Sequence, residues 1–137
     1  MINRYLPVVS VVLAAVFFGI ALYISVAEQP ARLSLADAPM LAEWQVSFQI
    51  GFVLQGTLTI LAGLFGLAAW WFVRDWCFLA GGVYMLANWP WTLLVIAPIN
   101  AALTGMDPAS ASEVSRTLIQ DWGQVHAARI VFALIAT

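Results

Sequence analysis

Three polar or ionisable side chains on the last apolar segment have the spacing of a single site. Trp122, His126 and Arg129 are four and then three residues apart, which places them on one face of an α-helix. Ionisable side chains at membrane depth are costly and need a partner or a function. This strip is therefore the first candidate site.

The composition places that strip in a membrane. The chain has 137 residues, of which 64% are hydrophobic and 9% are charged, whereas a soluble domain has about 25% charged residues. Residues 5–27, 44–73 and 76–106 carry no charge, and each run exceeds the roughly 20 residues that span a bilayer. Residues 117–137 are also long enough, although polar side chains interrupt them. We therefore expect an all-α, integral membrane four-helix bundle.

We expect one transmembrane domain over residues 1–137, with approximate helices at residues 4–27, 38–73, 75–104 and 109–136. The first apolar run resembles a signal peptide, but it is longer than the roughly 7–15 residues of such a core, so we interpret it as a membrane helix. The arginines are divided almost evenly between the two sides. We expect a protein of the bacterial inner (plasma) membrane, with both termini in the cytoplasm.

Several classes of function are disfavoured by composition. The chain has no lysine and its arginines are scattered, so there is no basic patch for nucleic acid. Cys77 is the single cysteine, which rules out an intrachain disulfide and suits a packing role. One histidine and one cysteine do not make a zinc site of the usual kind, and no second-ligand pattern supports haem on His126. We expect no metal site and no cofactor.

The third apolar run carries its own polar face. Tyr84, Asn88 and Thr92 are spaced four residues apart and so share one side of a helix. Pro90 lies between them and predicts a kink. Asparagine and threonine in membrane helices often only bond a neighbouring helix, for about 0.6 kcal/mol. A packing role for Asn88 and Thr92 therefore stays open beside a binding role.

Other polar residues lie closer to one membrane face. Asn100 is near the end of the third run, and Glu28 and Arg32 follow the first run. This distribution predicts a polar cavity that opens toward one face of the membrane and is closed toward the other. Glu28 or Asp121 could neutralise Arg129, and in that case Arg129 would only hold helices together.

Three segments resemble motifs of a known family. Residues 90–100 (PWTLLVIAPIN) and 122–129 (WGQVHAAR) are similar to the signatures of the third and last helices of the anthrone oxygenase-like family, and residues 28–32 (EQPAR) resemble a looser third motif. Members are small four-helix membrane proteins, and most are uncharacterised. The resemblance spans the whole four-helix layout.

The resemblance implies a function. Characterised members convert an anthrone to an anthraquinone with molecular oxygen and need no metal or organic cofactor. On this reading, His126 is the general base and Arg129 stabilises the substrate anion, in a membrane pocket for a flat apolar molecule. The expected substrate-binding residues are Trp122, Asn88, Thr92, Asn100, Trp91, Glu28 and Arg32.

Two other readings fit the same residues. The chain could be a non-catalytic small subunit of a respiratory or photosynthetic membrane complex. It could also bind a lipid or a quinone without changing it. The expected partners are the lipid bilayer and a hydrophobic small molecule, with other membrane subunits or a second copy of the chain as further alternatives.

Overall fold

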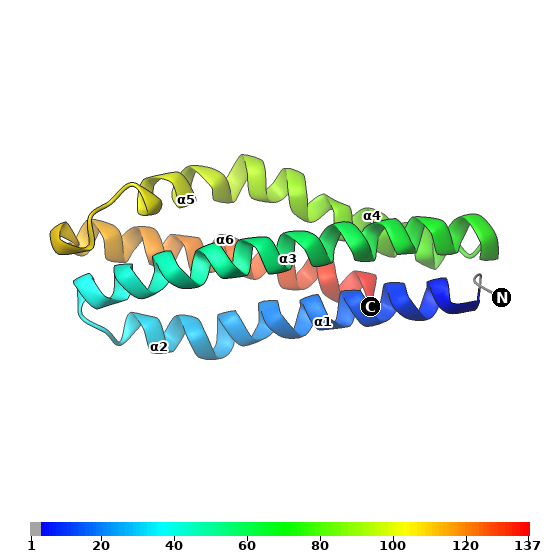
Figure 1. The fold of residues 1–137 in the computed structure, drawn as a ribbon, viewed down its shortest axis with the longest axis horizontal. Coiled ribbons are helices and arrows are strands. Elements are labelled where there is room, and N and C mark those ends of the chain that lie inside the picture. The colour runs from blue at the N-terminus through cyan, green and yellow to red at the C-terminus, as the bar shows by residue number, and fades with distance from the viewer. Residues whose placement is uncertain (1–3) are drawn as a thin grey trace.

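Four antiparallel helical rods make up the computed structural model, which describes residues 4–137 (Figure 1). Short turns join the rods end to end, and the described part of the chain contains no strand. This confirms the all-α four-helix bundle. The first rod is α1 (Tyr5–Tyr23), η2 (Ile24–Glu28) and α2 (Gln29–Leu33). The second rod is α3 (Asp37–Val73), and the third is α4 (Trp76–Trp91), η3 (Thr92–Ile96) and α5 (Ala97–Thr104). The short η4 (Pro108–Ser110) precedes the fourth rod, α6 (Glu113–Ala136).

The first three rods are long and apolar enough to cross a membrane. They expose large apolar side chains along their outer surfaces, including Ile50, Val53 and Leu94. In water such a surface would be unfavourable, whereas lipid chains solvate it. The chain is therefore an integral membrane protein. The fourth rod, α6, is more polar and packs against the other three.

Two rods contain a π-helical turn close to a proline. The turn η2 precedes Pro30, and η3 precedes Pro98. A proline ring has no N–H to donate and clashes with the carbonyl one turn earlier, so a wider turn relieves the clash without ending the helix. The first rod consequently runs past its expected end at residue 27 to Leu33, and residues 28–32 lie within it. The third rod continues through Pro90, and its irregular turn comes two residues later.

The fourth rod begins later than the expected residue 109. The Asp107 side chain accepts a hydrogen bond from the Ala109 N–H at 2.9 Å and so caps only η4. A reciprocal pair of hydrogen bonds between Ser112 and Ser115 then caps α6. These two caps separate a short 3-10 turn from the long helix that carries the candidate site.

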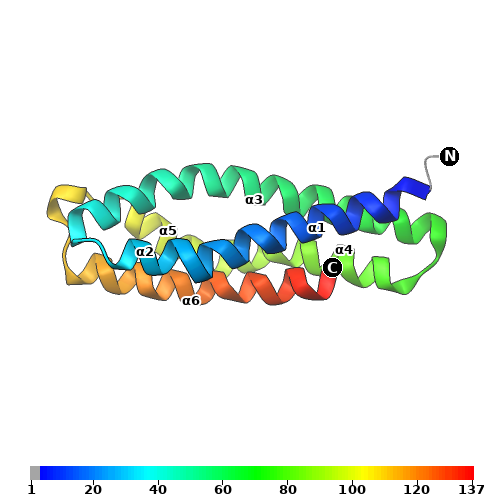
Figure 2. The ribbon, with the colours of Figure 1, turned by 90° about the horizontal axis from the view of Figure 1, so that it is seen from below.

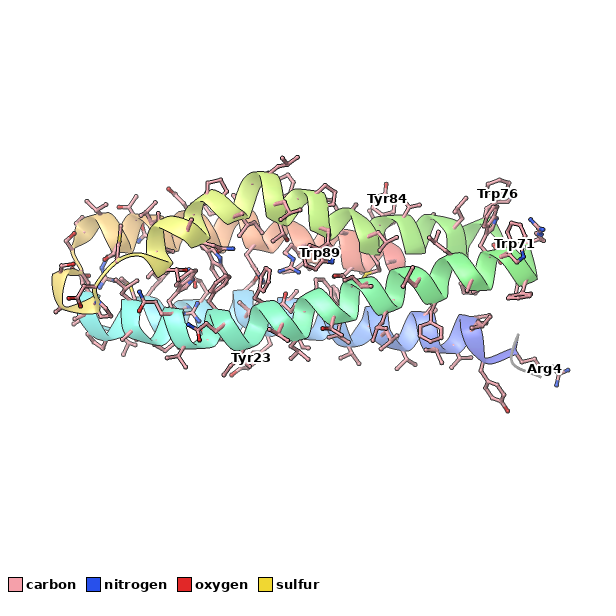
Figure 3. The ribbon with its side chains drawn as sticks, turned by 45° about the horizontal axis from the view of Figure 1, so that its top comes forward. Arg4, Tyr23, Trp71, Trp76, Tyr84 and Trp89 are labelled. Atoms are coloured by element: carbon pink, nitrogen blue, oxygen red, sulfur yellow. The ribbon has the colours of Figure 1, made fainter. Side chains whose placement is uncertain are left out.

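The turn between α3 and α4 is rich in tryptophan. Arg74 ends α3 in the left-handed conformation, with φ of 61°, and its guanidinium lies 4.8 Å from the Trp71 ring centre. Trp70 contacts both Trp71 and Trp76, and these last two side chains project from this end of the bundle (Figure 3). Exposed tryptophans beside an arginine suit the headgroup region of a bilayer.

Small residues let the rods approach closely in the half of the bundle near that turn. A Cβ added to Gly66 would lie 2.9 Å from the Gly82 Cα, so the backbones of α3 and α4 touch there. Buried alanines, including Ala14, Ala62 and Ala133, fill the adjoining core. Close backbone contact through small residues is a common way for membrane helices to associate.

We expect Gly66→Ala to destabilise the bundle by about 1–3 kcal/mol, because the new methyl group would force the α3 and α4 backbones apart. Thermal unfolding in mild detergent, followed by circular dichroism, measures the change. Gly19→Ala is the matched control, since a Cβ there meets nothing within 4 Å. Equal stability of the two variants would show that the α3–α4 contact is looser than the structure indicates.

Candidate functional site

A cavity lies inside the bundle, in the half opposite the tryptophan-rich turn. Its free space is small, about 30 Å³, which is room for about two water molecules, so a larger ligand would have to displace lining side chains. Side chains from η2, α3, η3, α5 and α6 line it, so all four rods contribute. The lining residues are Ile24, Glu28, Ser47, Phe48, Gly51, Phe52, Gln55, Thr92, Ile96, Asn100, Trp122, His126 and Arg129.

His126 reaches this cavity from α6. Its imidazole is stacked on the Trp122 ring, with ring centres 4.6 Å apart and an angle of 24° between the planes. The side chain is 2% exposed, and Nδ1 has no hydrogen-bond partner among residues 4–137. A buried polar atom without a partner is costly. A ligand or a water molecule in the cavity would remove that cost.

Arg129 lies one helical turn further along the same face of α6. Its Nε donates a hydrogen bond to the Asn88 Oδ1 at 3.3 Å, and its guanidinium carbon lies 5.0 Å from the Phe17 ring centre. The two terminal nitrogens form no hydrogen bond to any residue in the described range 4–137. They remain able to bind an anion in the cavity.

No carboxylate neutralises Arg129 within the described residues. Glu28 is ion-paired with Arg32 instead, and Asp121 is exposed. The suggestion that one of these carboxylates would hold Arg129 as a structural ion pair is therefore wrong. Arg129 is 8% exposed, so it is a nearly buried cation whose protein neighbours are an amide and an aromatic ring.

Asn88 orients this arginine. Its Nδ2 donates to the backbone oxygens of Tyr84 and Met85 in its own helix, at 3.2 and 3.1 Å. Both donors of the amide are thereby used, and Oδ1 is directed at Arg129. Asn88 lines a second, smaller cavity of about 20 Å³, which shares Phe52, Thr92 and Arg129 with the first.

Trp122 makes the second polar link between the third and fourth rods. Its Nε1 donates to the Asn100 Oδ1 at 2.9 Å, and its ring meets Trp44 edge-on with centres 5.8 Å apart. The polar faces of the two rods thus converge in two pairs, Asn88 with Arg129 and Asn100 with Trp122. Thr92 lies between them on the cavity wall and is 8% exposed.

Arg32 is satisfied by protein groups beside the cavity. Its guanidinium pairs with the carboxylates of Glu28 and Glu43 and donates to the Ser47 Oγ at 2.8 Å. The same guanidinium lies 5.7 Å from the centre of the Trp122 ring. Of the two residues predicted from the third motif, Glu28 lines the cavity whereas Arg32 lies behind it and holds the wall in place.

The structure places Trp91 away from the cavities. Its Nε1 donates to the Val125 backbone oxygen at 3.0 Å, and its ring meets Phe132 edge-on. These contacts fasten the third rod to α6. Trp89, in contrast, lines the smaller cavity and packs against Phe52 and Gly56 of α3 (Figure 3).

The residues that α3 contributes were not predicted. Gln55 is 2% exposed and lines the cavity, with no hydrogen-bond partner for Oε1 among residues 4–137. Phe48 and Phe52 supply aromatic surface, and Gly51 leaves room between them. The available signal was the four-residue spacing of Phe48, Phe52 and Gly56, which places all three on one face of α3.

The geometry defines a class of protein: a small helical membrane protein with a buried, partly polar cavity. No group of three histidine, cysteine, aspartate or glutamate side chains comes together as metal ligands in the part of the chain that the structure describes. The family model for anthrone oxygenase matches residues 44–137, and the chain belongs to this family. The matched segment includes His126, Arg129, Asn88 and Gln55. Comparisons with curated proteins and with solved structures find no match.

Proposed function

We propose that the chain is a membrane-embedded oxygenase that acts on a flat, apolar aromatic substrate of the anthrone type. The observation that carries this proposal is the nearly buried Arg129, without a carboxylate partner among the described residues, in the same cavity as His126. A buried cation is costly until an anion joins it. A substrate that becomes an anion within the cavity supplies that charge during the reaction.

His126 is the proposed base. An anthrone has a methylene group between two aromatic rings, and removing one of its protons moves an electron pair to the ring carbonyl oxygen. The imidazole takes this proton, and the Arg129 guanidinium stabilises the resulting oxyanion, with Asn88 orienting the guanidinium. Both groups face one cavity, which permits the two interactions to act on a single molecule.

The oxidation balances without an added reductant. The methylene carbon gives four electrons to O₂. One oxygen atom becomes the new carbonyl, and the other leaves as water with the two methylene hydrogens, one of which passes through His126. The protein therefore needs to supply a base, charge stabilisation and orientation. Belonging to the anthrone oxygenase family supports this choice of reaction.

The cavity walls suit flat rings. Phe48 and Phe52 come from α3, and Trp122 faces them from α6. The Trp44 and Phe48 rings are already stacked, with centres 4.8 Å apart and planes at 4°. Aromatic surfaces of this kind bind planar apolar molecules by offset stacking and area burial. This wall and the apolar surroundings support the choice of a flat, apolar substrate.

The direct test is oxygen uptake by the purified protein in lipid nanodiscs with anthrone as substrate. We expect one O₂ consumed per anthraquinone formed, and one labelled oxygen atom in the quinone when the gas is ¹⁸O₂. Empty nanodiscs measure the spontaneous oxidation of anthrone. Uptake by a folded protein that does not exceed this background would refute the oxygenase proposal for this substrate class.

We expect Gln55→Leu to raise KM for hydroxylated anthrones by about tenfold, since one buried hydrogen bond contributes up to about 1.5 kcal/mol. The leucine keeps the size of the side chain but removes its amide from the cavity. Steady-state kinetics with 1-hydroxyanthrone and unsubstituted anthrone measure the change. Gln49→Leu is the matched control, because Gln49 is exposed on the same helix. An unchanged KM for both substrates would remove Gln55 from the binding site.

One observation favours an assembly role as a second candidate. The outward face of α6 exposes Gln120, Asp121 and Gln124, which is unusual for a helix in contact with lipid. A partner subunit or a second copy would cover these groups. Native mass spectrometry of the gently solubilised particle tests this: a fixed heteromeric mass supports a complex subunit, and the mass of one chain contradicts it.

A further inference from the structure

Both ends of the cavity are closed by buried side chains. Toward the loops that follow α2 and α5, a cluster with no exposed surface fills the bundle, and it comprises Met40, Leu41, Trp44, Leu103 and Ile119. Toward the tryptophan-rich turn, Phe17 and Met85 close the core together with small residues. The membrane-face opening predicted from the distribution of polar residues is therefore blocked by the first cluster.

The gap between α3 and α4 is also filled. Trp89 lies against Gly56, where an added Cβ would be 3.2 Å from its ring, and meets Phe52 edge-on. Its ring thus occupies the space between the two helices beside the cavity.

The side between the first rod and α3, in contrast, is not filled by side chains. A broad groove runs along the outside of the bundle there, and four of its lining residues, Ile24, Glu28, Ser47 and Gly51, also line the cavity. Figure 2 shows α3 diverging from η2 and α2 in this half of the bundle. The groove and the cavity therefore adjoin, and these four residues lie between them.

Two glycines keep this groove open. A Cβ added to Gly19 would meet nothing within 4 Å, and at Gly51 it would meet only the end of Gln55 at 3.9 Å. Neither glycine is needed for a close helix contact, in contrast to Gly66. The remaining groove residues are mainly apolar, namely Val16, Ile20, Tyr23, Ile50 and Leu54.

We infer that this groove is a lateral portal through which a flat apolar molecule passes from the acyl-chain region of the bilayer into the cavity. The groove lies on two rods that are apolar enough to span the membrane, so its open side faces lipid. Apolar substrates concentrate in lipid, and a side opening spares them a passage through water. The identity of the molecule that passes rests on the proposed function, whereas the route itself does not.

Cysteine labelling tests the route without turnover. Cys77→Ser combined with Gln55→Cys places one thiol deep in the cavity, and the native exposed Cys77 is the reference for reagent reactivity. In nanodiscs, we expect N-phenylmaleimide to label this thiol and Gly19→Phe to slow the labelling by roughly tenfold, equivalent to about 1.4 kcal/mol of added barrier. Gly19 lines the groove and not the cavity, so the new ring obstructs the route without altering the site.

The matched control is Ala80→Phe, which adds the same ring to an exposed position on α4. It should leave the labelling rate unchanged. Equal rates with and without Gly19→Phe, no labelling at all, or faster labelling by a sulfonated membrane-impermeant maleimide would each overturn the portal. Oxygen uptake by the wild-type protein is measured separately, so failure of the oxygenase proposal and failure of the portal give different results.

Discussion

Replacing His126 with alanine is expected to lower turnover of an anthrone by about 10²–10⁴-fold, the usual contribution of a general base. His126 is the single histidine of the chain, and its imidazole faces the cavity that also holds the Arg129 guanidinium. Without it, proton removal would depend on water in an apolar site. Oxygen uptake in nanodiscs measures the loss, and circular dichroism confirms that the helices remain.

Two controls distinguish the loss of the proton acceptor from the loss of side-chain packing in the site. His126→Phe retains a ring that can stack on Trp122 but cannot accept a proton, so it should be as inactive as the alanine variant. Added imidazole should partly restore activity to His126→Ala, because the truncated side chain leaves space for it, and should not restore His126→Phe. Full activity in either variant without imidazole would exclude His126 as the base.

The bundle itself follows from the composition. Three uncharged runs longer than a bilayer crossing leave little choice except membrane helices. The sequence predicted polar groups on the third and last runs but not that they meet, and the structure pairs Asn88 with Arg129 and Asn100 with Trp122. Polar groups in lipid form hydrogen bonds to one another or to water, which favours such pairs once the helices pack.

The α3 side of the cavity was harder to predict. An apolar helix that faces lipid on one side and protein on the other has almost no hydrophobic periodicity, so hydropathy does not identify its inward face, and the aromatic spacing of Phe48 and Phe52 is the only signal that remains. Gln55 is buried whereas Gln49 is exposed, although both lie in the same uncharged run. The lateral groove depends on where η2 diverges from α3, which is a property of tertiary packing.

The end of the first helix was also predicted too early. It was expected at residue 27, but the π-helical turn η2 relieves the steric clash of Pro30 and the helix continues. This continuation places Arg32 inside the bundle, at 2% exposure, where two carboxylates surround it. Arg32, which was predicted to contact substrate, lies behind the cavity wall and not among the lining residues.

Arg32→Met is therefore expected to destabilise the bundle by about 3 kcal/mol, near the lower end for breaking a buried ion pair because Glu43 is partly exposed. The change leaves the Glu28 and Glu43 carboxylates close together without a cation and removes a contact to the Trp122 ring. Thermal unfolding in detergent measures the loss. Arg116→Met is the matched control, since its ion pair with Asp37 is more exposed and should contribute less.

A triple variant tests whether unpaired carboxylates or lost packing cause the destabilisation of Arg32→Met. If stranded carboxylates cause the loss, Arg32→Met combined with Glu28→Gln and Glu43→Gln should recover most of the stability, because replacing a whole buried ionic cluster with neutral groups is often neutral. If the loss comes from packing alone, the triple variant should be no more stable than Arg32→Met. If the triple variant regains stability but not turnover, the Glu28 carboxylate is needed for activity and not only for folding. Glu28 lines both the cavity and the lateral groove, which is consistent with that role.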